Sequence, residues 1–314
     1  MIRTQLAIFA MALCAVFSCS CSQSSAHAQS PATPPLEFIG QWGVKGDGPG
    51  QLDDPEGITT DDLGNVYIAD AGSRFIHKFN PAGTPLLSFQ ADALKEPEAI
   101  AVDSEGIIYV SDPSRSSVFV FLPDDEKEHH HEIRLRTKGS SENSVSVAVD
   151  IESVVYVLDE KAGKVFTFSP RFRMGHSWVP AAPSATDKKL VPASGPLHRG
   201  GDGNLYVADL AGNRLLRFST DGQLMAELAP SGVQADPKIA DQFAVSRNYI
   251  FIMDANGSML HVWNMDGSPK LDVDLSDKLG QTHRLPPLLA ASPRGELFVL
   301  DTRAPRVFRY RVNF

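Results

Sequence analysis

Cysteine is almost absent from this chain: its 314 residues include three, Cys14, Cys19 and Cys21, all near the start. Everything after residue 21 therefore has no disulfide framework and no thiolate metal site. The folded part must be stabilised by its apolar core alone, for which 42% hydrophobic residues provide ample material.

Basic residues are also in short supply. The 29 Lys and Arg face 38 Asp and Glu, which gives a formal net charge of −9. Nucleic-acid binding depends on neutralising phosphates with Lys and Arg, so we expect no nucleic-acid partner. Long apolar runs are missing as well. The run at residues 6–17 is too short to span a bilayer, and we expect no transmembrane helix in the mature chain.

The first residues are typical of an export signal. Arg3 precedes the apolar run, and AHA at 26–28 fits a signal-peptidase site, so residues 1–28 are predicted to be a signal peptide and 29–35 a linker. The alternative is lipoprotein processing, because VFSC ending at Cys19 resembles a bacterial lipobox and would lipidate Cys19. Both routes predict an exported protein that is periplasmic, extracellular or lipid-anchored at the cell envelope.

One sequence motif recurs along the chain. GNVYIADAGSRFIHKF at 64–79 comes back as GNLYVADLAGNRLLRF at 203–218 and as GELFVLDTRAPRVFRY at 295–310. Its aspartate has six equivalents, separated by 42, 47, 50, 45 and 47 residues: Asp70, Asp112, Asp159, Asp209, Asp254 and Asp301. Aromatic residues are only 8% of the chain, yet they occupy the positions three before and nine after every one of these aspartates. This period is typical of propeller blades.

Each copy predicts four antiparallel strands, which in the first copy are GITTD (57–61), NVYIAD (65–70), RFIHKF (74–79) and PLLSF (85–89). The second is apolar throughout, as in a strand buried on both faces, whereas the third alternates and should have one wetter face. Six such sheets stacked around an axis bury surfaces that one sheet leaves exposed. We therefore predict an all-β fold over residues 36–314: a six-bladed β-propeller of four-stranded antiparallel blades.

The last copy ends after its third strand, at RVFRYRVNF, whereas LEFIGQWG at 36–43 precedes the first copy as an unassigned strand. The N-terminal strand is therefore predicted to complete the final blade and close the ring, with Phe38 beside the stretch around Phe308.

The stretch GQWGVKGDGPGQLDDPEGITTDDLGNVYIADAGSRFIHKF resembles an NHL repeat, in its glycine-rich lead, Pro-x-Gly-Ile, Gly-Asn-Val-Tyr and final Asp. The resemblance covers residues 36–314 and is most specific in copies one, two and four. In copies three and five Ser153 and Asn248 replace the turn glycine. Membership implies a six-bladed propeller but no single activity, because the family includes interaction scaffolds, RNA binders and a few lyases and hydrolases.

Members of this family usually bind ligands where the chain enters the innermost strands, around the central channel. There the sequence places Glu56, Glu98 and Asp241, with His198 a little deeper. Converging carboxylates could hold a divalent cation, as in lactonase-type propellers, and Glu56, Glu98 and Asp241 would then be its ligands. The alternative, which we favour, is that these are solvated residues of the repeat, and we assign no metal or other cofactor.

Other polar residues have two interpretations each. Loop cations such as Arg74, Arg115, Arg214 and Arg303 could attract an anionic ligand or pair with nearby acids. The repeated aspartates are expected to accept backbone N–H bonds in the loops that follow them. Three histidines in DDEKEHHHE (124–132) suggest a metal, but consecutive strand residues alternate faces, so we favour a solvated hairpin.

No Gly-x-Ser-x-Gly, P-loop or His-Glu-x-x-His motif is present. We therefore favour a monomeric, non-enzymatic scaffold that binds a protein, peptide or glycan at the channel mouth. The alternative is a metal-dependent hydrolase or lyase, similar to the lactonases, acting at the same place.

Overall fold

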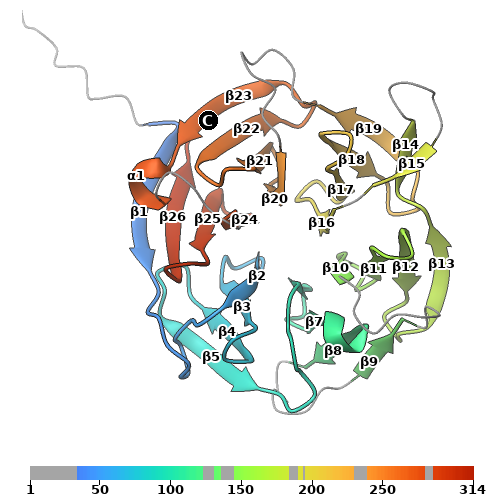
Figure 1. The fold of residues 1–314 in the computed structure, drawn as a ribbon, viewed down its shortest axis with the longest axis horizontal. Helices are drawn as coiled ribbons and strands as arrows, with labels where there is room; N and C mark the ends of the chain where they lie inside the picture. Colours follow the sequence, from blue (N-terminus) through green and yellow to red (C-terminus); the bar gives the residue numbers. More distant parts are fainter. Residues whose placement is uncertain are drawn as a thin grey trace, which may run out of the picture. The chain divides into compact units, whose positions relative to one another are not determined.

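The computed structural model describes residues 34–122, 131–135, 145–183, 190–193, 195–229, 239–279 and 286–314, without the side chains of residues 191 and 239–241. Residues 34–314 form one unit. In it, six four-stranded antiparallel sheets surround a common axis, which confirms the predicted six-bladed propeller (Figure 1).

The strands of each blade run in order from the axis outward. Blade one contains β2 (Pro55–Thr60), β3 (Val66–Asp70), β4 (Phe75–Phe79) and β5 (Pro85–Gln90). Blade two contains β6 (Ile100–Val102), β7 (Ile108–Asp112), β8 (Ser117–Phe121) and β9 (His131–Arg134). Blade three contains β10 (Val145–Val149), β11 (Val155–Asp159), β12 (Lys164–Phe168) and β13 (Met174–Trp178).

The second half of the ring repeats this order. Blade four contains β16 (Leu197–Arg199), β17 (Leu205–Asp209), β18 (Arg214–Phe218) and β19 (Leu224–Leu228). Blade five contains β20 (Ile239–Val245), β21 (Tyr249–Asp254), β22 (Met259–Asn264) and β23 (Pro269–Asp274). Blade six contains β24 (Leu288–Ser292), β25 (Glu296–Asp301), β26 (Arg306–Val312) and β1 (Leu36–Trp42).

Three short elements lie between these strands. They are the 3₁₀ helix η1 (Pro113–Arg115), the helix α1 (Ser276–Leu279) and a hairpin of β14 (Ala181–Pro183) with β15 (Leu190–Pro192). Within the described ranges, no helix is both long and apolar enough to cross a membrane.

The N-terminal strand closes the ring as predicted. β1 pairs antiparallel with β26, and Phe38 lies opposite Tyr310 while Gln41 lies opposite Phe308. The Phe38 ring is 5.6 Å from the Tyr310 ring and 6.5 Å from the Phe308 ring. Because the two strands come from opposite ends of the unit, their hydrogen bonds join its beginning to its end (Figure 1).

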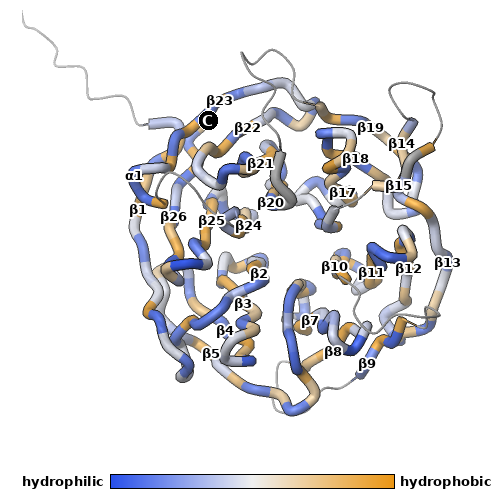
Figure 2. The backbone as a smooth tube through the Cα atoms, viewed as in Figure 1, coloured by the Kyte–Doolittle hydropathy of each residue, from blue (hydrophilic) through white to orange (hydrophobic). Residues whose placement is uncertain are grey.

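The core lies between neighbouring blades. One buried cluster, for example, joins Phe251 and Val262 of blade five to Val299 and Phe308 of blade six. In Figure 2 the inner strands β24 and β25 are mostly hydrophobic, whereas the outer strand β23, with the sequence PKLDVD, alternates between hydrophilic and hydrophobic residues. The second strand of each blade is buried on both faces, as its continuous apolar sequence predicts.

The prediction of a wetter face for the third strand is wrong for the middle of β4. Ile76 and His77 point to opposite faces of the sheet, yet both are buried. His77 stays buried because its Nδ1 lies 2.8 Å from the Ser88 hydroxyl of the neighbouring strand. Burial lowers the pKa of His77 to about 4, so the ring is neutral at pH 7.

Outer strands cover the turns of the next blade. The indole of Trp42 lies 4.7 Å from the Phe79 ring and directly over Gly83, whose φ of +86° favours glycine. A Cβ at Gly83 would overlap the indole. Trp178 covers Gly222 of the next blade in the same way. These turn glycines are therefore needed for packing between blades as well as for turn geometry.

The repeated aspartates at the ends of the second strands bind backbone N–H groups, as predicted. Asp70, fully buried, accepts from the N–H groups of Asp53, Asp54 and Ser73 at 2.7, 3.2 and 3.0 Å. Equivalent backbone bonds reach the other five aspartates. Their role is to hold the loops next to the strands.

A second set of aspartates was missed. In blades one to four the turn after the innermost strand carries an aspartate that accepts a tyrosine hydroxyl from the second strand. The pairs are Tyr67–Asp61, Tyr109–Asp103, Tyr156–Asp150 and Tyr206–Asp202, at 2.8–3.2 Å. Burial and the neighbouring carboxylate both raise the pKa of each tyrosine. In blades five and six the tyrosine is phenylalanine and the aspartate is serine.

Candidate functional site: two cavities on the propeller axis

The first cavity, which we call the strand-start cavity, lies where the chain enters the innermost strands. It has a volume of about 210 Å³ and draws its lining from all six blades. Its polar side chains include those of Glu56, Glu98, Glu160, His198 and Gln242. The lining identified within the described residues contains no Lys or Arg.

The structure brings together three of the four residues predicted for the channel mouth. Glu56 follows Pro55 at the start of β2, Glu98 precedes β6, and His198 lies in β16. All three line the strand-start cavity. The fourth, Asp241, belongs to β20, but its side chain lies outside the part of the chain that the structure describes.

His198 lies deeper than the two glutamates, since it lines the second cavity as well. Its ring meets the Phe243 ring edge-on at 4.6 Å. Burial lowers the pKa of His198 to about 4, so the imidazole is neutral at pH 7. It can therefore offer one N–H donor and one nitrogen acceptor to a ligand, but no charge.

The predicted loop cations lie outside both cavities. None of Arg74, Arg115, Arg214 and Arg303 is among the lining residues. Arg214 pairs with acids, as the alternative interpretation predicted: its Nε lies 2.7 Å from Asp209, and its Nη1 donates to Glu227 at 2.6 Å. Arg303 donates to the Leu279 carbonyl oxygen at 2.8 Å.

The metal hypotheses gain no support from the described residues, among which no group of three His, Cys, Asp or Glu side chains is placed to hold an ion. Most of the histidine-rich stretch, residues 123–130, lies outside the description. His131 begins β9, and its ring stacks on Phe172 at 4.4 Å, so this histidine packs between blades two and three.

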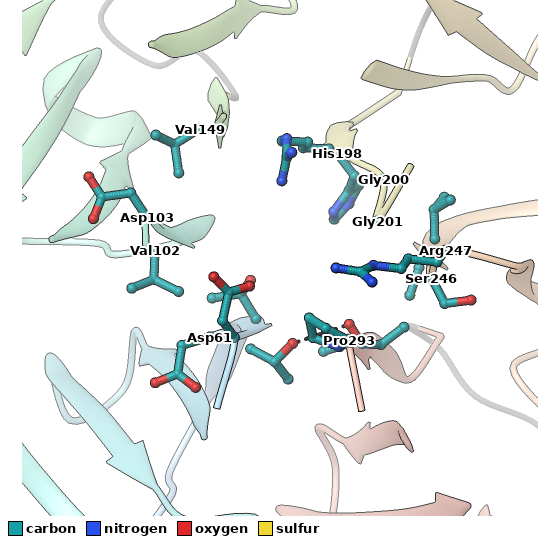
Figure 3. Close-up of a pocket in the computed structure, with 18 of the residues that line it drawn as sticks. Asp61, Val102, Asp103, Val149, His198, Gly200, Gly201, Ser246, Arg247 and Pro293 are labelled. Atoms are coloured by element: carbon teal, nitrogen blue, oxygen red, sulfur yellow. Dashed lines mark hydrogen bonds between the residues drawn. The ribbon is translucent and has the colours of Figure 1, made fainter. Parts of the chain in front are cut away.

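The second cavity, which we call the turn cavity, lies at the other end of the innermost strands, next to the turns that follow them. It has a volume of about 150 Å³. Asp61 and Asp103 lie on one side of it, and His198 and Arg247 lie on the other (Figure 3). Ile58, His198 and Leu289 line both cavities, so the two are adjacent along the axis.

Sequence reasoning missed Arg199 and Arg247, which both line the turn cavity. The sequence signal that could have identified them is a comparison of the six copies at the end of the innermost strand and in the turn that follows it. The residues equivalent to Arg199 in the other five blades are all small or aliphatic, so Arg199 is the one charged residue at its position. None of the residues equivalent to Arg247 in the other blades is basic.

Comparisons with known proteins agree with the fold. A streptogramin B lyase structure matches with a TM-score of 0.59 and 12% identity, over 88% of this chain and 97% of that one. Selenomethionine-substituted virginiamycin B lyase from Staphylococcus aureus matches with a TM-score of 0.60 and 10% identity, over 88% and 100%. A catalytically inactive variant of the S. aureus enzyme with quinupristin gives 0.56 and 11%, over 83% and 95%.

No family model matches the chain, and no curated protein matches its sequence. At such low identities the likeness to the lyase structures shows a shared six-bladed propeller and nothing about activity.

Proposed function

We propose that this chain is an exported NHL-type propeller that binds a protein, peptide or glycan through the strand-start cavity. The observation that carries the proposal is that Glu56, Glu98 and Glu160, from three different blades, line one cavity. Each of the three glutamates also has an interaction partner within the chain. Carboxylates accept hydrogen bonds, which favours a ligand rich in N–H or O–H donors.

The size of the cavity supports a scaffold that grips part of a larger ligand. Pockets that enclose a whole drug-sized molecule measure about 300–1,000 Å³, whereas this cavity measures about 210 Å³. A side chain or a single sugar ring would enter it, and the remainder of the ligand would lie across the surrounding loops. Peptide backbones and glycans both present several donors at that scale.

The test uses a displayed library of random heptapeptides and a panel of oligosaccharides as probes. We expect the probes that bind to lose about tenfold or more in affinity with Glu56→Gln/Glu98→Gln, because each lost charge-assisted bond weakens binding. The matched control is Glu105→Gln/Glu152→Gln, which removes two exposed glutamates from the turn side of the ring. Equal binding by both double variants would contradict the proposal.

A second candidate is a metal-dependent lyase or hydrolase at the same cavity. The observation in its favour is that Glu56, Glu98 and His198 share one cavity, in a fold that the streptogramin and virginiamycin B lyases also adopt. Elemental analysis and thermal shifts with calcium or zinc distinguish the two candidates. Stoichiometric metal that is lost in Glu98→Ala/Asp241→Ala would favour the enzyme, and absence of metal with unchanged melting would favour the scaffold.

Export is part of the proposal. Its support is the leader sequence, with Arg3, the short apolar run and the alternative processing sites after Ala28 or before Cys19. Mass spectrometry of the mature N-terminus tests it: Gln29 at the terminus indicates signal-peptide cleavage, whereas a diacylated Cys19 indicates a lipid anchor. An unprocessed Met1 in cells that carry the protein would contradict export.

A further inference from the structure

The turn cavity is lined by one equivalent residue from each of the six blades. Equivalence follows from the strand register, in which Ile58 pairs with Ile68, Leu197 with Val207 and Leu289 with Val299. Four residues beyond Ile58 and its counterparts, the cavity-lining residues are Asp62, Ser104, Ile151, Gly201, Arg247 and Pro293. The side chains at this one position differ in charge, polarity and size from blade to blade. The common fold therefore does not require any particular residue there.

Blade four departs furthest from the repeat. The five equivalents of His198 are threonine or alanine: Thr59, Ala101, Ala148, Ala244 and Ala290. The five equivalents of Arg199 are likewise small or aliphatic: Thr60, Val102, Val149, Val245 and Ala291. The fold therefore accepts a small residue at both positions, yet blade four places an imidazole and a guanidinium there.

Neither arginine in the cavity has an ion-pair partner among the described residues. Among the described residues, Arg199 and Arg247 form no ion pair and no side-chain hydrogen bond. The Nε of Arg199 is also buried without a hydrogen-bond partner. The guanidinium of Arg247, on an exposed residue, points toward the centre of the cavity (Figure 3). Two guanidinium groups in one cavity repel each other, and a bound anion would remove that cost.

We propose that the turn cavity binds the carboxylate or phosphate group of a small molecule through Arg199 and Arg247. A guanidinium presents N–H donors in a planar fork that matches both kinds of anion. His198 lies on the same side and adds a neutral donor. This site shares His198 with the strand-start cavity but does not depend on the function proposed there.

The opposite side of the cavity limits the ligand to a compact anion. Asp61, Asp62, Asp103 and Asp150 all line it. The carboxylates of Asp61, Asp103 and Asp150 already accept turn N–H groups and tyrosine hydroxyls, whereas Asp62 is exposed. A polyanion such as nucleic acid would extend into these charges and be repelled.

The test is calorimetric titration of the full-length protein at low ionic strength with inorganic phosphate, with succinate and with a single-stranded oligonucleotide. We expect one molecule of phosphate or succinate to bind per chain, and whichever binds identifies the anion. Arg247→Gln and Arg199→Gln should each weaken that binding about tenfold or more. The matched control is Arg171→Gln, which removes an exposed arginine from a turn outside the cavity.

Three results would overturn the proposal: no heat from either small anion at millimolar concentration, an equal loss in Arg171→Gln, or tighter binding of the oligonucleotide than of both small anions. Arg199→Gln could disturb the innermost strand, so circular dichroism and thermal melting accompany each variant. Arg247 is exposed on a turn, and its substitution leaves the core intact. If Arg199→Gln does not fold, the result for Arg247→Gln decides alone.

Discussion

A disulfide across the β1–β26 pair should stabilise the propeller more than a typical engineered crosslink. Leu36 lies opposite Val312. In the adjoining pair, Pro35 and Asn313, the Asn313 N–H donates to the Pro35 carbonyl oxygen at 2.8 Å. Because hydrogen-bonded and non-hydrogen-bonded pairs alternate along an antiparallel ladder, Leu36 and Val312 form a non-hydrogen-bonded pair. The Cα atoms of such a pair lie about 4.5 Å apart, which is within the range that a disulfide spans.

The expected gain follows from the length of the closed loop. The chain-entropy relation gives about 5.6 kcal/mol for a loop of roughly 280 residues. The entropy of unfolding is about 2.1 cal/mol/K per residue, so a unit of roughly 280 residues loses about 0.6 kcal/mol per degree near its midpoint. The crosslink should therefore raise Tm by up to about 9 °C, less any strain in the new bond.

The assay is differential scanning calorimetry of Leu36→Cys/Val312→Cys, with Cys14, Cys19 and Cys21 replaced by serine so that no other thiol competes. The reduced form of the same protein is the reference, because it carries the same loss of apolar side chains without the bond. If the two thiols fail to link under mild oxidation, the pairing of β1 with β26 is wrong. If they link and Tm does not rise, the loop-closure entropy does not stabilise the folded ring as calculated, and the reasoning is refuted.

Three smaller perturbations test other contacts. Tyr109→Phe removes the 3.1 Å bond to Asp103 in the core and should cost about 1–2 kcal/mol in chemical denaturation; an unchanged midpoint would show that the pair adds no stability. Neutral His77 contributes stability in full above its unfolded pKa of about 6.5, and that stability is lost as pH falls toward its folded pKa of about 4. His77→Phe removes this titration, so between those pH values its unfolding free energy should fall by about 3 kcal/mol less than that of the unmodified protein. Equal pH profiles for the two proteins would contradict the lowered pKa of His77. Gly83→Ala and Gly295→Ala both place alanine at positive φ, for about 1 kcal/mol each. Only at position 83 would the new methyl overlap an indole, adding about 1–3 kcal/mol, and equal melting points would refute that contact.

The ring and its closure could be predicted because both depend on features that recur. Every blade needs a second strand that is apolar on both faces, so Tyr67 and its five equivalents are aromatic at the same spacing. The closing strand was predictable by subtraction, since the last copy lacks an outer strand and LEFIGQW precedes the first copy. The burial of His77 was not predictable, because its polarity suggested solvent and only the position of Ser88 across the strand pair satisfies it.

The candidate sites could be predicted only in part. Glu56 and Glu98 each stand two residues before an equivalent position of the innermost strand, Ile58 or Ile100, so the repeat places them on the same side of the channel, and the structure brings them into one cavity. Arg199 and Arg247 escaped because they belong to different blades and follow no motif. Their proximity appears only once the ring is closed and the strand register is known.

The tyrosine–aspartate pairs also explain where the turn cavity can accept an anion. A buried tyrosine hydroxyl requires an acceptor, so each blade must keep both partners or lose both. Blades one to three keep the pair, and Asp61, Asp103 and Asp150 line the cavity. Blade four places its acceptor two residues later in the turn, outside the lining, and blade five replaces the pair with Ser246 and Phe251. The described lining residues from blades four to six thus include Arg199 and Arg247 but no carboxylate, so the same exchange that preserves the core leaves the lining acids on the opposite side of the cavity.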